Sequence, residues 1–101
     1  MAIETTVSED GNLLVIKIKG KFDFTMLNEF RQAYCDNSIT PNKYVVDMRH
    51  TLTIDSSALG MLLNMKRHLN SPDGAIRIIN CNKIVQKVLH ITNFNKKFVV
   101  E

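Results

Sequence analysis

Hydrophobic and polar positions follow two periods along this chain, one typical of β-strands and one typical of α-helices. The segment Leu13–Lys19 alternates, with Ile16 and Ile18 on one side and lysines on the other, which predicts a half-buried strand. The segment Met26–Asp36 instead repeats apolar side chains at helical spacing, and Thr25 just before it is a residue type that caps helices. The two periods then alternate along the rest of the chain.

These periods predict eight elements. The expected strands are Ile3–Val7, Leu13–Lys19, Lys43–Met48, Ala75–Asn80 and Lys97–Val100, and the expected helices are Met26–Asp36, Ser57–Leu69 and Ile84–Ile91. Strands joined through helices favour parallel pairing, and the opening hairpin adds antiparallel pairing. We therefore expect an α/β fold in the order β-β-α-β-α-β-α-β, with helices packed against a mixed sheet. Residues 1–101 are expected to form a single domain around one core.

Composition narrows the classes of function. Apolar residues make up 45% of the chain and charged residues 23%, which is ordinary for a globular protein. The net charge of +3 is scattered, whereas nucleic-acid binding needs a concentrated basic face. Cys35 and Cys81 are too few for a disulfide framework, and we expect both to be buried thiols. The chain shows neither a signal peptide nor a membrane-spanning apolar run, so we expect a cytoplasmic protein.

The most informative segment is Asp55-Ser56-Ser57, which lies where a loop meets an apolar helix. Backbone N–H groups at a helix start have no partner within the helix, and the helix dipole there favours negative charge. Aspartate and serine at this place can act as plain N-caps. A serine there can equally carry a phosphate that the helix start tolerates. The residues alone leave both interpretations open, with capping the commoner of the two.

The helix after this segment has two unusual features. Gly60 lies in its first two turns, where glycine costs about 1 kcal/mol relative to alanine. Either the sheet or a partner therefore needs to approach the backbone there. The apolar side chains also spread over roughly 200° of the helical wheel, more than a core-facing stripe requires. An inner face needs only four of them: Ala58, Leu62, Met65 and Leu69.

An exposed apolar shoulder on this helix would mark an interaction surface. Met61 is its natural centre, because flexible thioether side chains adapt to partners. The alternative is that Met61 packs beneath a neighbouring loop. The residues of this helix that we expect at a partner interface are Ala58, Gly60, Met61 and Met65.

The sequence does not contain the constellations of common enzymes. It has no Gly-x-Ser-x-Gly elbow and no Gly-rich phosphate loop. His50, His68 and His90 lack the spacing of metal ligands. His50 lies near Ser56 in sequence and could in principle reach it, although a loop histidine is more often solvated. We expect a non-enzymatic protein without a metal or cofactor.

The string Asp55-Ser56-Ser57-Ala58-Leu59-Gly60 resembles the Asp-Ser-Ser/Thr-Gly-Leu-Gly signature of STAS-domain anti-sigma factor antagonists. Gly20-Lys-Phe-Asp23 resembles the Gly-x-x-Asp that closes the second strand in that family. The likeness in size and element order extends over nearly the whole chain. One departure is Ala58, where the family more often has glycine. The resemblance implies a STAS-like fold.

By this resemblance, Ser56 matches the phosphoacceptor of the family. Ser57 matches a neighbouring hydroxyl that we expect to cap the helix, and Asp23 and Asp55 flank the acceptor. The resemblance also implies partner switching in transcription control. In such systems the unphosphorylated antagonist binds an anti-sigma factor, which is a serine kinase of the GHKL ATPase type, and so frees the sigma factor.

Phosphorylation releases the antagonist in these systems, and a PP2C-like phosphatase removes the phosphate. Related domains also have other roles within the same fold. The alternative is therefore a STAS domain that is not phosphorylated and serves as an accessory subunit of a transporter or as a scaffold of a stress-signalling assembly.

Overall fold

The computed structural model describes residues 2–35 and 41–101. The main sheet has the strand order β1 (Ile3–Val7), β2 (Leu13–Ile18), β4 (Lys43–Asp47), β6 (Ile76–Ile79) and β7 (Val99–Val100). β1 pairs with β2 in antiparallel orientation, and the other neighbours pair in parallel. A second, smaller sheet consists of the parallel pair β3 (Gly20–Phe22) and β5 (Thr51–Ile54). The predicted mixed α/β fold is confirmed.

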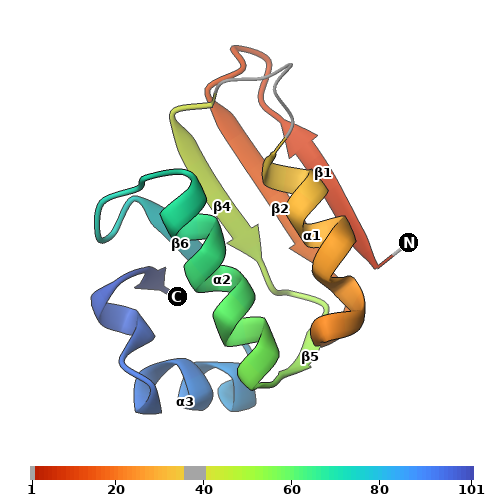
Figure 1. Ribbon diagram of the computed structural model, residues 1–101, viewed down its shortest axis with the longest axis vertical. Coiled ribbons are helices and arrows are strands. Elements are labelled where there is room, and N and C mark those ends of the chain that lie inside the picture. The colour runs from red at the N-terminus through yellow and green to blue at the C-terminus, as the bar shows by residue number, and fades with distance from the viewer. Residues whose placement is uncertain (1, 36–40) are drawn as a thin grey trace.

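Within the described residues, the α-helices are α1 (Leu27–Tyr34), α2 (Ser56–His68) and α3 (Lys83–Ile91). α1 and α2 lie side by side over one face of the sheet, and α3 lies at the end of the molecule where α2 begins (Figure 1). Short 3-10 turns at Phe24–Met26 and Phe94–Lys96 precede α1 and β7. Within the described ranges, no helix is both long enough and apolar enough to cross a membrane.

β3 and β5 lie in segments for which the sequence predicted no regular structure. They contain three and four residues, so neither is long enough to show a strand period of its own. Gly20, the first residue of β3, has a φ of +90°, a left-handed conformation that glycine adopts without a steric penalty. Its backbone N–H donates to the carbonyl oxygen of His50, just before β5. This turn carries the chain out of the main sheet and onto β5.

Helix α1 begins at Leu27 rather than at Met26, because a 3-10 turn precedes it. The N-cap of that turn is Asp23, whose carboxylate accepts a hydrogen bond from the backbone N–H of Thr25 at 3.0 Å. Thr25, the cap expected from the sequence, instead donates its own hydroxyl to the same carboxylate. The expected last residue of this helix, Asp36, lies outside the described residues.

The hydrophobic core fills the space between the main sheet and the two helices that cover it. β2 contributes Leu14, Ile16 and Ile18, which are all 1% exposed or less, while its lysine faces the opposite side. Aromatic rings extend this core toward β3. Phe30 of α1 packs on Phe22 with ring centroids 5.2 Å apart. The alternation predicted for β2 is therefore confirmed.

The buried side of α2 is wider than a simple inner stripe. Ala58, Leu62 and Met65 are 0% exposed and Met61 is 4% exposed. The expectation that Met61 and Met65 offer a contact surface is wrong, and Ala58 is likewise hidden. The reason is that α2 is covered by the sheet on one side and by α1 on another, so a broad arc of the helix is buried (Figure 1).

The two cysteines also differ from expectation. Cys35 and Cys81 are free thiols, and both are partly exposed rather than buried. Cys35 follows α1, whereas Cys81 follows β6.

Replacing Met65 by alanine should lower the free energy of unfolding by about 2–5 kcal/mol, because a fully buried thioether would leave a cavity. Asn64, the exposed residue beside it, provides the control: its replacement by alanine should change stability by less than about 0.5 kcal/mol. Urea unfolding of both variants measures the difference. Equal losses in the two variants would contradict the burial of this face of α2.

Candidate functional site

The pairing of β3 with β5 brings Asp23 and Asp55 to the same end of two neighbouring strands. Phe22 at the end of β3 pairs with Ile54 at the end of β5, and each aspartate directly follows. Both aspartates adopt extended backbone conformations and cap the helical turn that comes next. The structure therefore brings together these two residues of the predicted site.

Asp55 is the N-cap of α2. One oxygen of its carboxylate, Oδ1, accepts the backbone N–H of Ala58 at 3.0 Å and the hydroxyl of Ser57 at 2.6 Å. These two hydrogen bonds, with that from Ser57 the larger cause, hold the pKa of Asp55 below its ordinary value. The expectation that Ser57 caps the helix is wrong, because the carboxylate of Asp55, two residues earlier, accepts the free N–H of Ala58. Ser57 instead holds the capping carboxylate in place.

Ser56 is the first residue of α2, and it is exposed. At this helix start, side-chain hydrogen bonds join Asp55 to Ser57 and to Ala58. Within the described part of the chain, no side-chain hydrogen bond uses the hydroxyl of Ser56. Capping is thus performed by its neighbours, and among the described residues the hydroxyl of Ser56 takes no part in it. An exposed hydroxyl at a helix start is accessible to another molecule.

β5 is held on both sides, which fixes the position of Asp55 and Ser56. The side-chain amide of Asn82 donates to the carbonyl oxygens of Thr51 and Leu52 at 3.1 and 3.0 Å. The amide oxygen of Asn82 meanwhile caps α3 by accepting the N–H of Val85 at 2.8 Å. On the other side, the buried hydroxyl of Thr51 donates to the carbonyl oxygen of Ile18 at 2.7 Å. The site is therefore anchored to both α3 and β2.

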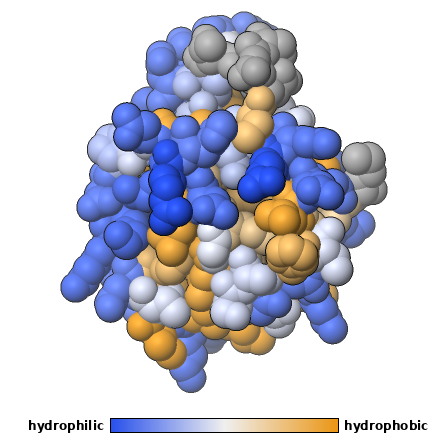
Figure 2. All heavy atoms as spheres, viewed as in Figure 1, coloured by the Kyte–Doolittle hydropathy of each residue, from blue (hydrophilic) through white to orange (hydrophobic). Residues whose placement is uncertain are grey.

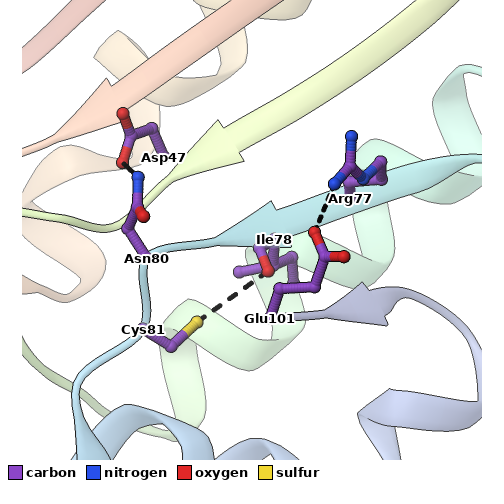
Figure 3. Close-up of polar contacts among 6 residues, drawn as sticks. All are labelled: Asp47, Arg77, Ile78, Asn80, Cys81 and Glu101. Atoms are coloured by element: carbon purple, nitrogen blue, oxygen red, sulfur yellow. Dashed lines mark hydrogen bonds and ion pairs between the residues drawn. The ribbon is translucent and has the colours of Figure 1, made fainter.

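A further link joins the ends of β4 and β6 (Figure 3). The Asn80 amide donates to the carboxylate of Asp47 at 3.0 Å. Burial raises the pKa of Asp47, but the hydrogen bonds from Asn80 and from the backbone N–H of Arg49 outweigh it, so the net pKa is lowered. Asp47 stays ionised at neutral pH and fixes the segment that leads from β4 into β5.

The outward side of α2 carries Ser56, Gly60 and Asn64, which are all exposed and follow one another at four-residue intervals on one face. A Cβ atom added at Gly60 would meet nothing within 4 Å. Close approach of the sheet therefore does not explain this glycine. Approach of a partner to this glycine stays a prediction.

Exposed apolar side chains lie on the segments that lead to this helix start and on α3, which is hydrogen-bonded to β5. Phe24 is 65% exposed, Leu52 59% and Ile84 58%, and we call these three residues the apolar rim. They come from the turn after Asp23, from β5 and from the first turn of α3. Figure 2 shows hydrophobic residues gathering at the end of the molecule where Figure 1 places α3 and the start of α2. Such an exposed cluster is typical of an interaction surface.

Sequence reasoning missed the apolar rim because its members lie on three separate segments. Ile84 fits the apolar run of its helix, and Leu52 stands among polar loop residues. A signal was present only at Phe24, an apolar residue that falls outside any strand or helix period, between Asp23 and Thr25.

His50 and Ser56 lie at opposite ends of β5. Four strand residues separate them, and an extended strand rises roughly 3.3 Å per residue. The idea that the His50 imidazole reaches the Ser56 hydroxyl is therefore wrong. Within residues 2–35 and 41–101, no three His, Cys, Asp or Glu side chains gather closely enough to hold a metal ion.

Comparisons with known proteins identify the family. The model of the STAS domain matches residues 4–101. The chain is also 45% identical over 100 residues to a STAS-domain containing protein of Pseudomonas aeruginosa strain UCBPP-PA14, and this match covers 99% of each chain. The chain belongs to the STAS domain family.

Solved structures share this STAS fold. The anti-sigma factor antagonist SpoIIAA in its unphosphorylated form superposes with a TM-score of 0.77 at 18% identity, covering 99% of this chain and 88% of SpoIIAA. A sulfate transporter family protein from Wolinella succinogenes superposes with a TM-score of 0.73 at 15% identity, covering 92% of this chain and 79% of that one. At such low identity, these likenesses show the fold and not the activity.

The lowered pKa of Asp55 predicts a pH dependence of stability. The folded state binds the carboxyl proton of Asp55 more weakly than the unfolded state does. The stability that the ionised Asp55 gives the folded state is therefore fully present above the ordinary pKa of 3.8. It is lost as the pH falls through the lower pKa of the folded state. The wild type should therefore lose stability relative to Asp55→Asn between about pH 4 and pH 2. Urea unfolding across this range measures the difference, and a constant difference would contradict an ionised cap.

Proposed function

We propose that this STAS domain is a non-enzymatic anti-sigma factor antagonist that is switched by phosphorylation of Ser56. The observation that carries the proposal is the division of labour at the start of α2. Asp55 and Ser57 satisfy the helix start, and Ser56 remains exposed beside them. The shared fold with SpoIIAA, itself an anti-sigma factor antagonist, supports this role.

The proposed partner of the unphosphorylated form is an anti-sigma factor that is also a serine kinase of the GHKL type. Binding to it frees the sigma factor, and a PP2C-like phosphatase returns the phosphorylated domain to its binding form. These partners follow from the resemblance of the segment Asp55–Gly60 to the family signature. The cytoplasm is the compartment in which such a system works.

The surface that we propose for the partner consists of the outward side of α2 and the apolar rim. Gly60 lets a partner backbone approach α2 closely, because the glycine has no side chain and open space above it. Phe24, in the turn after Asp23, and Leu52, in β5, supply exposed apolar contact area on the two strand segments that end in Asp23 and Asp55. Such apolar anchors around a central contact are typical of binding hot spots.

The switch follows from charge. A phosphate adds about −1.5 to −2 charges at pH 7, and it would lie beside the carboxylates of Asp23 and Asp55 on neighbouring strand ends. The N-terminal end of the α2 dipole offsets part of this repulsion within the domain, so the fold tolerates the phosphate. The helix dipole does not offset the repulsion and desolvation that the phosphate imposes on a partner bound at the same place. A penalty of about 2–3 kcal/mol would weaken binding about 30- to 150-fold.

The first test is phosphorylation by the cognate anti-sigma factor kinase with ATP, followed by intact mass spectrometry. We expect the wild type to gain about 80 Da, the mass of one phosphate, and Ser56→Ala to gain nothing. Ser57→Ala is the matched control, because it removes the adjacent hydroxyl and leaves Ser56 in place. Transfer of the phosphate to Ser57, or its retention in Ser56→Ala, would contradict the assignment.

The second test is the affinity for the anti-sigma factor, measured by calorimetry. Ser56→Ala should bind like the wild type, and Ser56→Asp should bind about 5- to 30-fold more weakly, since it adds one charge where the partner docks. Its melting temperature should stay close to that of the wild type.

Asn64→Asp is the matched control for this second test, because it adds the same charge to the same side of α2, about 12 Å further along the helix. Its loss of affinity should be clearly smaller than that of Ser56→Asp. Equal losses would show that the position of the charge does not matter. A large fall in the melting temperature of Ser56→Asp would show that the serine is chiefly structural.

The alternative role is an accessory subunit of a transporter, or a scaffold in a stress-signalling assembly. The observation that favours a transporter is the similarity of this fold to the sulfate transporter family protein. That role needs no phosphate at Ser56. Absence of any mass gain with an active cognate kinase, together with copurification of a membrane transporter, would favour it over the switch.

A further inference from the structure

At the end of α2 opposite Ser56, a thiol and an imidazole meet. Cys35 is the C-cap of α1 and His68 is the last residue of α2. The sulfur of Cys35 lies 3.5 Å from Nε2 of His68. The ring of Tyr34 packs edge-on against the imidazole with centroids 5.5 Å apart, and Tyr34 is itself only 8% exposed. A buried ring therefore holds the imidazole beside the thiol.

The imidazole also borders a hollow in the surface. This hollow has a volume of about 240 Å³ and is lined by Arg31, Tyr34, Asn64, Arg67 and His68. The two arginines come from α1 and α2, and neither forms an ion pair with a residue that the structure describes. Two arginines in a hollow that His68 also lines favour a ligand that carries carboxylates, because arginine binds carboxylates through paired hydrogen bonds.

We propose that Cys35 is a site of reversible mixed-disulfide formation with a low-molecular-weight thiol that carries carboxylates. The hollow beside His68 receives the body of this molecule, and Arg31 and Arg67 bind its carboxylates. His68 lies about 18 Å along α2 from Ser56, so the modified thiol is at the far end of this helix, and only Asn64 is shared with the surface proposed for the anti-sigma factor.

The reaction is a thiol–disulfide exchange. The Nε2 atom of His68 accepts the proton of the Cys35 thiol, and the thiolate attacks one sulfur of the small disulfide. A new disulfide bond forms to Cys35 as the original disulfide bond breaks. The second half of the small molecule leaves as a thiolate and takes the Cys35 proton from the imidazolium, which returns His68 to its neutral form. The incoming disulfide is the oxidant, so no further reagent is needed.

Cys81 provides an internal comparison within the same chain. Its sulfur is directed toward the carbonyl oxygen of Ile78, at 4.0 Å (Figure 3). Burial, and then the negative charge of Asp47, raise the pKa of Cys81 to about 11. At neutral pH it is almost entirely a thiol, which is the unreactive form. Cys81 therefore serves as a slowly reacting internal control for the rate at which a disulfide reagent modifies Cys35.

The test uses glutathione disulfide as the probe with carboxylates and 2-hydroxyethyl disulfide as an uncharged probe, both at pH 7. Intact mass and peptide mapping follow each cysteine. We expect one glutathionyl group on Cys35, removed by a reductant, while Cys81 reacts much more slowly. His68→Gln should slow the reaction of Cys35 with both probes by about tenfold, because the proton acceptor is lost.

The arginines are tested through the preference between the two probes. Arg67→Gln should reduce the preference for glutathione disulfide by about threefold, as expected for one partly exposed charge pair. Lys87→Gln removes an exposed cation on α3 and should leave the preference unchanged. The ratio of the modification rates of Cys35 and Cys81 is measured in the wild type and needs no variant. Equal rates for the two cysteines, an unchanged rate in His68→Gln or an unchanged preference in Arg67→Gln would each overturn the proposal.

Discussion

The capping of α2 by Asp55 is the interaction on which the rest of the site depends. Its carboxylate binds the N–H of Ala58 and the hydroxyl of Ser57, and it thereby begins the helix at Ser56. If a serine were the N-cap, its hydroxyl oxygen would accept a backbone N–H of the first helical turn and would not be free. Because the aspartate takes that task, the next residue is left exposed at the positive end of the helix dipole. The structural role of the cap and the signalling role proposed for Ser56 thus fall on adjacent residues.

This cap is placed by a small sheet that is separate from the main one. β3 and β5 pair in parallel, so that Asp23 and Asp55 end neighbouring strands and cap consecutive turns in the same way. Asn82 then ties β5 to α3 through two carbonyl oxygens. Ser56, the proposed phosphoacceptor, therefore follows a strand that is held on both sides. A switch based on added charge needs this rigidity, since the phosphate has to change the surface and leave the fold intact.

Periodicity predicted most of the main sheet and its helices, because β2 and the helices each bury one consistent face. It missed β3 and β5, which are too short to show a period and are formed by pairing between segments distant in sequence. The expectation that Met61 and Met65 contact a partner is wrong because a helical wheel shows how wide an apolar arc is, but not how many neighbours cover it. The contact of Cys35 with His68 joins residues 33 positions apart and has no sequence signal.

The central claim is that a phosphate on Ser56 changes a surface and not a fold. The most direct measurement compares backbone amide chemical shifts of the unphosphorylated and phosphorylated domain by NMR. The account predicts shifts confined to the turn after β3, the end of β5 and the first turns of α2. Shift changes that extend through β1, β2 and β4 would show that the phosphate rearranges the core, and they would contradict the account.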